Sequence, residues 1–275
     1  MNNQKGFNLL PQTEEPERDI GVIIGKFMPL HKGHELLINF GKKHVKQLFI
    51  LVDNTINDTI DSKLREKIIQ KHFPDVKVLS FNEKMPQDPS ETNDFWNIWK
   101  TEMEKLVFKN TINNKIDVLF ASMDYGEKLS ETLGCEFVPF DISRSTLNIS
   151  ATEIRNDPLG NWKYISDCFK PYFVNKYLFT GAESTGKTTL INRLINETDL
   201  FKESLSLFVP EYAYQFIKTK KELKSSDIPL LFSAQDTLIN EASKTSEGVL
   251  LCDSSAITTK AYAQQMFPQE YEEIP

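Results

Sequence analysis

Apolar, β-branched runs alternate with helical patterns through the first half of the chain. The strand-like runs cover residues 20–27, 46–53, 76–81, 116–122 and 135–140, and the helix-like segments between them cover 33–45, 61–73, 93–108 and 126–133. Strands that alternate with helices form a parallel sheet with helices on both faces. Ligands of such sheets bind beyond the carboxyl ends of the strands. We therefore predict an α/β domain over residues 19–158, with its binding site at that edge.

The same pattern starts again after a segment rich in turn formers and aromatic residues. We assign residues 159–175 to a linker and 176–275 to a second α/β domain. Its predicted strands cover 176–181, 204–210 and 248–253, and its predicted helices begin at Lys187 and Glu211 and cover about 226–243. The first 18 residues are polar and lack the apolar core of a signal peptide, so we expect a flexible tail.

The composition is that of a globular protein, with 40% hydrophobic and 26% charged residues among 275. The net charge of −7 argues against nucleic-acid binding, which usually needs a basic face. The three cysteines are far apart and predict neither a disulfide framework nor a zinc cluster, which favours a cytoplasmic protein. No apolar run approaches the roughly 20 residues of a membrane span, so no membrane association is expected. The sequence leaves the oligomeric state open, a homo-oligomer included.

The stretch GKFMPLHKGH (25–34) joins the first predicted strand to the next helix, and it contains two of the four histidines, His31 and His34. A helix start presents free backbone amides and a dipole that attract anions, and Gly33 permits close approach. A plain turn, a zinc pair and a phosphate site are the alternatives. Zinc lacks a third ligand at suitable spacing, so the turn and the phosphate site remain.

A second helix start occurs at ISATEIR (149–155). Ser150 followed by Glu153 forms a capping box, which predicts that a helix begins at Ser150. Thr152 offers a hydroxyl, and Arg155 offers a forked guanidinium suited to phosphate. Taken alone, an ordinary capped helix explains this motif equally well. Two helix starts of this kind in one α/β pattern favour a shared phosphate site.

GKFMPLHKGH resembles the GxFxPxHxGH motif of the nucleotidyltransferase superfamily, and ISATEIR resembles its ISxTxIR motif. The resemblance implies a Rossmann-like fold in which His31, His34 and Arg155 stabilise the charge on a nucleoside triphosphate. The other expected nucleotide contacts are Gly25, Lys26, Phe27, Gly33, Ser150 and Thr152. The implied reaction is nucleotidyl transfer from ATP with Mg²⁺.

Trp96 and Trp99 bear on the identity of the acceptor substrate. They lie near one another on a predicted helix. Each tryptophan could pack in the core or form an aromatic platform for a flat ring, and the sequence leaves both roles open. Together with ASMDYGEKL (121–129), this region resembles the nicotinamide-mononucleotide adenylyltransferases. That resemblance implies that Trp96 stacks on nicotinamide and that Asp124 contacts the nucleotide. The superfamily motifs also allow another acceptor, such as phosphopantetheine.

GAESTGKT (181–188) fits the P-loop pattern GxxxxGK[ST] between a strand and a helix. In this motif the amides from Gly181 to Gly186 surround the β-phosphate, and Lys187 reaches the β- and γ-phosphates. Thr188 is expected to bind Mg²⁺, and Thr189 is a further expected nucleotide contact.

Two acids follow strands of the same predicted domain. Asp253 ends the run GVLLCD and is expected to help hold Mg²⁺. Glu211 follows another strand and is expected to orient a substrate hydroxyl or accept its proton. Each acid has a plain alternative as a helix cap.

The order of motifs resembles the bifunctional NadR-type proteins, which join nicotinamide-mononucleotide adenylyltransferase to ribosylnicotinamide kinase. The resemblance implies nicotinamide riboside, nicotinamide mononucleotide and ATP as ligands. Tyr214, Ser255 and Met123 stand where the family usually has Arg, a second acid and Glu. The second domain has only 100 residues (176–275) and no recognisable arginine-bearing lid, so we expect an incomplete kinase domain or one completed by another chain. A nucleotide sensor with an inactive kinase domain is the alternative. The 18 residues before the first strand are too few for the family's DNA-binding domain, so direct repression is not expected.

Overall fold

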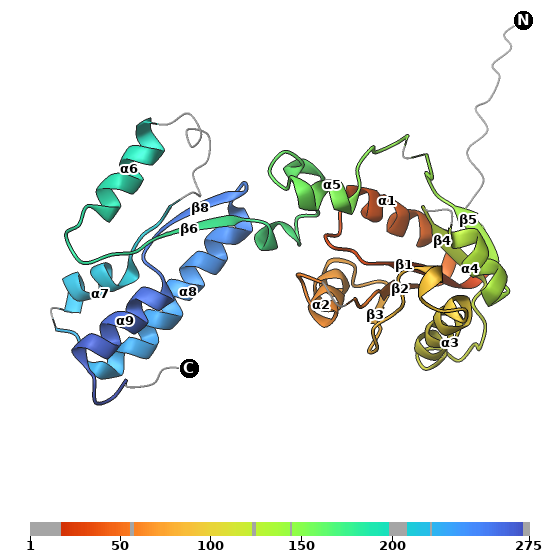
Figure 1. Ribbon diagram of the computed structural model, residues 1–275, viewed down its shortest axis with the longest axis horizontal. Coiled ribbons are helices and arrows are strands. Elements are labelled where there is room, and N and C mark those ends of the chain that lie inside the picture. Colours follow the sequence, from red (N-terminus) through yellow and green to blue (C-terminus); the bar gives the residue numbers. More distant parts are fainter. Residues whose placement is uncertain are drawn as a thin grey trace, which may run out of the picture. The chain divides into compact units, whose positions relative to one another are not determined.

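The computed structural model describes residues 18–55, 58–122, 125–143, 145–197, 208–220 and 222–271. The chain divides into two compact units, Met1–Asn156 and Asp157–Pro275, coloured red to green and green to blue in Figure 1. The predicted tail, residues 1–18, lies outside the described residues except for Arg18. Among the described residues, no helix has both the length and the apolar character needed to cross a membrane.

The first unit is built on a parallel sheet with the strand order β3-β2-β1-β4-β5. The strands are β1 (Arg18–Gly25), β2 (Val45–Val52), β3 (Lys77–Ser80), β4 (Val118–Ala121) and β5 (Glu136–Pro139). All five strands predicted from the sequence are therefore confirmed, with ends shifted by one to two residues. The chain moves outward from β1 to β3 and then returns to the other side of β1 at β4. This reversal creates a crevice beyond the carboxyl ends of β1 and β4.

Helices cover both faces of this sheet (Figure 1). They are α1 (Lys32–Gly41), α2 (Ser62–His72), α3 (Phe95–Phe108), α4 (Tyr125–Leu133) and α5 (Ala151–Asn156). Alternate residues of β1 face opposite sides: Val22 belongs to the apolar cluster that contains Met103 of α3, whereas Ile23 lies beside Gly41 of α1. Because β1 is packed on both sides, its carboxyl end has a fixed position, and so does the start of α1, which follows it.

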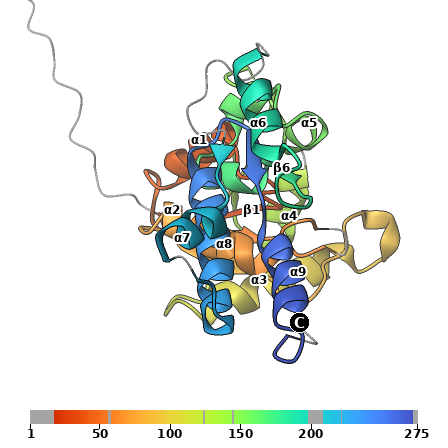
Figure 2. The ribbon, with the colours of Figure 1, turned by 90° about the vertical axis from the view of Figure 1, so that its left-hand side faces the viewer.

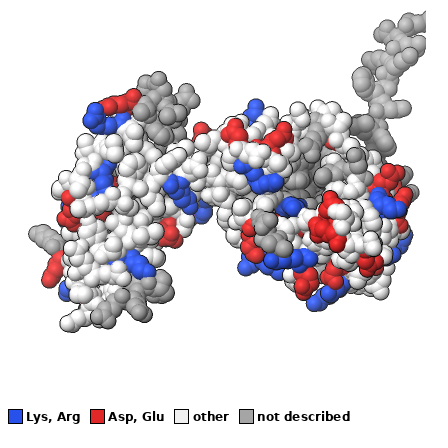
Figure 3. All heavy atoms as spheres, in the orientation of Figure 1, with Lys and Arg blue, Asp and Glu red and all other residues white. Residues whose placement is uncertain are grey.

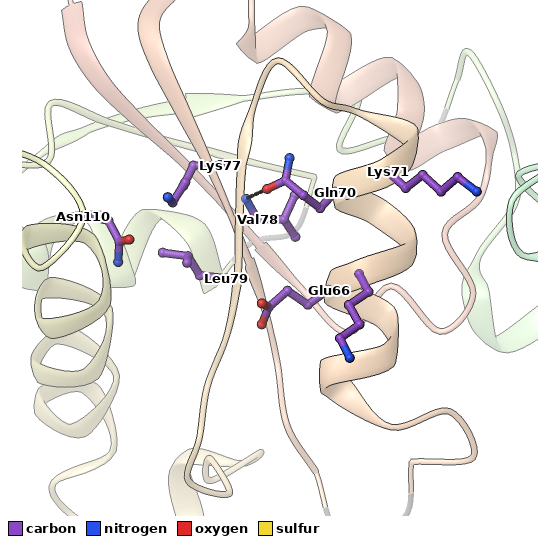
Figure 4. Close-up of a pocket in the computed structure, with 8 residues that line it drawn as sticks. Glu66, Gln70, Lys71, Lys77, Val78, Leu79 and Asn110 are labelled. Carbon is purple, nitrogen blue, oxygen red and sulfur yellow. Dashed lines mark hydrogen bonds between the residues drawn. The ribbon is translucent and has the colours of Figure 1, made fainter.

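The outer strand β3 has its free edge covered by side chains of α2 (Figure 4). The amide of Val78 donates to Gln70 Oε1 at 3.0 Å, and the amide of Ser80 donates to Glu66 Oε2 at 2.8 Å. Gln70 Nε2 also donates to the carbonyl of Val76 at 2.9 Å. A shallow cleft of about 490 Å³ lies between these elements. The polar side chains of α2 thus bond backbone groups of β3 that would otherwise be free to pair with another strand.

The second unit has a parallel sheet with the order β6-β8-β7. Its elements are β6 (Asn175–Phe179), β7 (Phe208–Val209), β8 (Val249–Asp253), α6 (Lys187–Glu197), α7 (Tyr212–Lys220), α8 (Ile228–Thr245) and α9 (Ala256–Met266). The predicted strands and helices are confirmed where they are described, although residues 204–207 lie outside the described residues. Helix α9 was not predicted; it lies beside α8 (Figure 2).

The linker predicted over residues 159–175 differs from the observed structure. Ile165 and Phe169 are fully buried, and the short 3-10 helix Lys170–Tyr172 contacts α8. Trp162 packs against the apolar cluster that contains Leu250 of β8. The apolar side chains of this segment gain free energy by leaving water, so the segment packs onto the second unit and the division falls after residue 156.

Charged side chains are distributed differently over the two units. Acidic and basic groups are interspersed over the drawn face of the first unit, whereas the charged groups on the drawn face of the second are fewer and more scattered (Figure 3). Several large apolar side chains of the second unit are exposed, among them Tyr177 and Leu178 of β6 and Leu190 of α6. The second unit therefore presents several large apolar side chains to solvent.

Candidate functional site

A cavity of about 600 Å³ lies beyond the carboxyl ends of β1 and β4 in the first unit. It is lined by eleven of the residues singled out in the sequence: Gly25, Lys26, Phe27, His31, Gly33, His34, Trp96, Trp99, Ser150, Thr152 and Arg155. The structure thus brings the two helix-start motifs and both tryptophans to one place. Asp124, also predicted for this site, lies outside the described residues.

The two histidines sit at the start of α1. His31 is the N-cap residue, and its Nδ1 accepts a hydrogen bond from the amide of Gly33 at 3.1 Å. Because Nδ1 is the acceptor, the proton of neutral His31 belongs on Nε2. The rings of His31 and His34 are stacked with their centroids 3.7 Å apart, and Phe27 contacts His34 edge-on at 4.9 Å. These contacts restrict both imidazoles to one orientation each.

Arg155 connects the second motif to the histidine loop. Its Nη1 donates to the carbonyl of Met28 at 2.7 Å, and its Nη2 donates to Thr152 Oγ1 at 2.9 Å. The predicted capping box is confirmed: Glu153 N donates to Ser150 Oγ at 3.2 Å, and Ser150 N donates to Glu153 Oε2 at 2.7 Å. The guanidinium is consequently placed beside the start of α1, where anions are stabilised.

The two tryptophans of α3 have different surroundings. Trp99 is buried, its Nε1 donates to the carbonyl of Pro86 at 3.1 Å, and its ring meets Phe81 edge-on. Trp99 is therefore chiefly a core residue. Trp96 is only partly buried and lines the cavity with Phe95. Both tryptophans line the cavity, and Trp96 is the more exposed of the two; its stacking role stays a prediction.

Asp53 and Gln87 line the same cavity and were missed in the sequence. Asp53 directly follows β2 and is 5% exposed; its amide donates to the carbonyl of Gly25 at 3.0 Å. Burial raises the pKa of the Asp53 carboxyl, and Gln87 and Lys26 oppose that rise. The available signal was an acid at the end of an apolar run, LFILVD, the same signal that identified Asp253 in the second unit.

The P-loop of the second unit connects β6 to α6. Gly181 and Gly186 have φ angles of 152° and 88°, which residues that carry a side chain rarely adopt. The ammonium of Lys187 donates to the carbonyls of Gly181 and Ala182 at 3.0 and 2.9 Å. The loop, the following helix and the lysine thus have the arrangement that the motif predicts. Thr189 is exposed on the first turn of α6.

Two acids lie near this loop, as predicted. The hydroxyl of Thr188 donates to the carboxylate of Asp253, which is 3% exposed. Asp253 Oδ1 is buried and accepts no hydrogen bond within the described ranges. Burial raises the pKa of Glu211, and the negative charge of Asp253 raises it further. Hydroxyl and carboxylate oxygens are the ligands that Mg²⁺ prefers, so the donors present fit that ion.

Two departures from the resemblance have visible consequences. Ser255 is the N-cap of α9, and its Oγ accepts from the amide of Thr258 at 3.3 Å. The serine therefore begins a helix where the family usually has a second acid. Tyr214 is 65% exposed on α7 and takes no part in the apolar cluster of that helix. Met123 lies outside the described residues.

Comparisons with known proteins agree with this two-unit organisation. A family model described as an AAA domain matches residues 176–274. The trifunctional NAD biosynthesis/regulator protein NadR of Escherichia coli strain K12 is 28% identical over 93% of this chain, and that of Salmonella typhimurium strain LT2 is 27% identical over 93%. The chain spans 65% of the length of each of these relatives.

Two crystal structures of NadR proteins share the fold. One, in complex with NR, has a TM-score of 0.72 at 24% identity and is matched over 94% of this chain and 74% of its own. The other, in complex with NAD and AMP-PNP, has a TM-score of 0.68 at 24% identity, over 93% of this chain and 77% of its own. The predicted fold class is confirmed in its architecture: an α/β unit built on a parallel sheet with helices on both faces is followed by a P-loop α/β unit.

Proposed function

We propose that the first unit transfers AMP from ATP to nicotinamide mononucleotide, giving NAD and pyrophosphate. The observation that carries this proposal is the hydrogen bond from Arg155 to the Met28 carbonyl, which joins the two phosphate-type motifs at one cavity. The aromatic side of that cavity, at Trp96, suits a flat pyridine ring. The similarity to proteins named NadR supports the same reaction.

In the proposed reaction, a phosphate oxygen of the mononucleotide attacks the α-phosphorus of ATP. A new P–O bond forms, the bond between the α-phosphorus and the bridging oxygen breaks, and pyrophosphate leaves. The attacking phosphate is already ionised, so the chain needs to position the reactants and stabilise charge rather than remove a proton. His31, His34 and Arg155 supply donors for the charge that develops on the triphosphate, and Trp96 holds the ring.

We propose further that the second unit phosphorylates the 5′-hydroxyl of nicotinamide riboside with ATP. The P-loop amides and Lys187 hold the triphosphate. Glu211 accepts the proton of the hydroxyl, and its raised pKa makes it a better base than an ordinary glutamate. Thr188 and Asp253 would hold Mg²⁺, which neutralises phosphate charge when bound. The product is the substrate of the first unit. The two proposed reactions use intracellular nucleotides, which fits the cytoplasmic location expected from the sequence.

The test is an assay with ATP, Mg²⁺ and one pyridine substrate at a time. Wild-type protein is expected to form NAD from either the riboside or the mononucleotide. Lys187→Ala protein should form NAD only from the mononucleotide, and His34→Ala protein should convert the riboside to the mononucleotide and stop there. An active NadR protein assayed alongside is the control.

Each negative outcome has a distinct meaning. If the mononucleotide gives no NAD while the control does, the first proposal fails, and other acceptors such as phosphopantetheine become the candidates. If the riboside is not phosphorylated but nucleotide still binds, the second unit acts as a nucleotide sensor instead. Equal activity of Lys187→Ala and wild-type protein on the riboside would exclude the P-loop as the kinase site.

A further inference from the structure

Asp53 occupies a fixed position at the floor of the cavity in the first unit. It follows the last residue of β2, and its amide is held by the Gly25 carbonyl at 3.0 Å. The side chain is 5% exposed and lines the cavity. The strand and this hydrogen bond fix the backbone of Asp53, and burial limits the space into which its carboxylate can turn.

One oxygen of this carboxylate has an unused capacity for a hydrogen bond. Asp53 Oδ1 is buried and accepts no hydrogen bond from the described part of the chain. The side chain of Gln87 and the charge of Lys26 both favour the ionised form. Keeping a buried acceptor without a donor costs free energy, and a ligand that brings an N–H or O–H recovers it.

The aromatic side of the cavity is connected to Asp53 by backbone contacts. The amide of Met85 donates to the carbonyl of Asn54 at 3.1 Å, and the next residue, Pro86, accepts from Trp99 Nε1 at 3.1 Å. Residues 85–87 thus run from the end of β2 to α3. Asp53 therefore lies between the loop that begins at Gly25 and the segment that supports Trp99, within the same cavity.

We propose that Asp53 determines which pyridine nucleotide is accepted: its carboxylate takes a hydrogen bond from the carboxamide N–H of the nicotinamide ring and rejects the nicotinate ring. The inference rests on the proposed adenylyl transfer to nicotinamide mononucleotide. A carboxamide brings two N–H donors to Oδ1. A nicotinate brings no donor and a second negative charge, which a buried carboxylate repels.

The test compares kcat/KM for nicotinamide mononucleotide with kcat/KM for nicotinic acid mononucleotide. The ratio of the two constants does not depend on how much of a preparation is folded, so it remains interpretable for a destabilised variant. Wild-type protein is expected to prefer the amide by about 100-fold or more. Asp53→Asn removes the negative charge and exchanges one carboxylate oxygen for an N–H donor, so it should reduce this ratio by about 10- to 100-fold, partly through a gain with nicotinate.

Asp75→Asn is the matched control, because this carboxylate is exposed, pairs with Lys42 and lies outside the cavity. Its ratio should equal that of wild-type protein. Asp53→Ala should lower the ratio in the same direction as Asp53→Asn, without the gain with nicotinate.

The outcomes separate this inference from the function on which it rests. If wild-type protein adenylylates neither mononucleotide, the proposed function has failed. If wild-type protein is active but Asp53→Asn lowers both constants by the same factor, the carboxylate contacts a part common to both substrates, such as the ribose, and the specificity role is excluded. If Asp53→Asn leaves both constants and their ratio unchanged, the specificity role of Asp53 is excluded as well.

Discussion

Arg155 has contacts in the cavity of the first unit that depend on its being an arginine. Its two nitrogens are committed to Met28 and Thr152 at 2.7 and 2.9 Å, which fixes the plane of the guanidinium. Lysine is a point charge without this fork and cannot keep both contacts. We expect Arg155→Lys to lower kcat/KM for adenylylation by about 100- to 1000-fold, the usual cost of losing a charge-stabilising donor.

Circular dichroism melting accompanies that measurement. Because Arg155 is exposed, the melting temperature of the Arg155→Lys protein should stay close to that of wild-type protein. Arg193→Lys is the control, since Arg193 pairs with Glu197 on the surface of α6. An Arg155→Lys enzyme with near wild-type kcat/KM would contradict the assigned role.

Glu211 gives the kinase reaction an expected pH dependence. Burial and the neighbouring Asp253 raise its pKa above the ordinary glutamate value of about 4.3. A base must be ionised, so the rate of riboside phosphorylation should be full above the raised pKa and fall as the pH drops through it. Glu211→Gln should have a lower rate and lack this acidic limb, whereas Glu197→Gln should retain it. The pH profile of kcat/KM measures this; an unchanged limb in Glu211→Gln would assign it to another group.

Among single residues, those belonging to short motifs could be predicted from the sequence and the others could not. His31 and Gly33 lie two positions apart, so their relationship is local and visible in the chain. Asp53 and Gln87 meet only because residues 85–87 cross the end of β2, and nothing within either segment encodes that contact. The carboxyl-end acid was a usable but ambiguous signal, since aspartate is also common in turns.

The covered edge of β3 makes a measurable contribution at the level of elements. Gln70 serves both an amide and a carbonyl at this edge, those of Val78 and Val76. We expect Gln70→Ala to lower the free energy of unfolding of the first unit by about 1–3 kcal/mol, because partly buried backbone groups lose their partner.

Urea denaturation measures this loss, and hydrogen exchange of the Val78 amide should accelerate with it. Lys67→Ala on the exposed side of the same helix should change the free energy of unfolding by no more than about 0.5 kcal/mol. If the two variants unfold at the same urea concentration, the edge contacts contribute nothing measurable.

Elements were predictable where the hydrophobic period was strong. The buried runs of β1 and β2 and the amphipathic pattern of α3 were assigned correctly for that reason. Helix α9 was missed because its sequence, AITTKAYAQQM, mixes β-branched and small residues without a clear apolar stripe. The segment around Phe169 reads as a linker because turn formers dominate it, and only tertiary packing shows that Ile165 and Phe169 are core residues.

On the scale of the whole molecule, the two proposed reactions belong to separate units, and each unit contains its own site residues. His34→Ala and Lys187→Ala proteins should each fail to make NAD from nicotinamide riboside. A mixture of the two should make it after a lag, because one supplies the mononucleotide that the other consumes. Liquid chromatography of the products over time measures both the lag and the intermediate. Two variants that each perform their own half-reaction but do not complement in a mixture would show that the intermediate is not released.

The contact between Arg155 and Met28 spans 127 residues of chain. We expect a contact of such long sequence separation to form late in folding, because the loop it closes has a high entropic cost until the intervening strands have paired. During synthesis, the loop of residues 25–34 is made early but has no guanidinium beside it until Arg155 has emerged from the ribosome. We therefore expect the proposed nucleotide binding to begin only when the sheet that supports the site is complete.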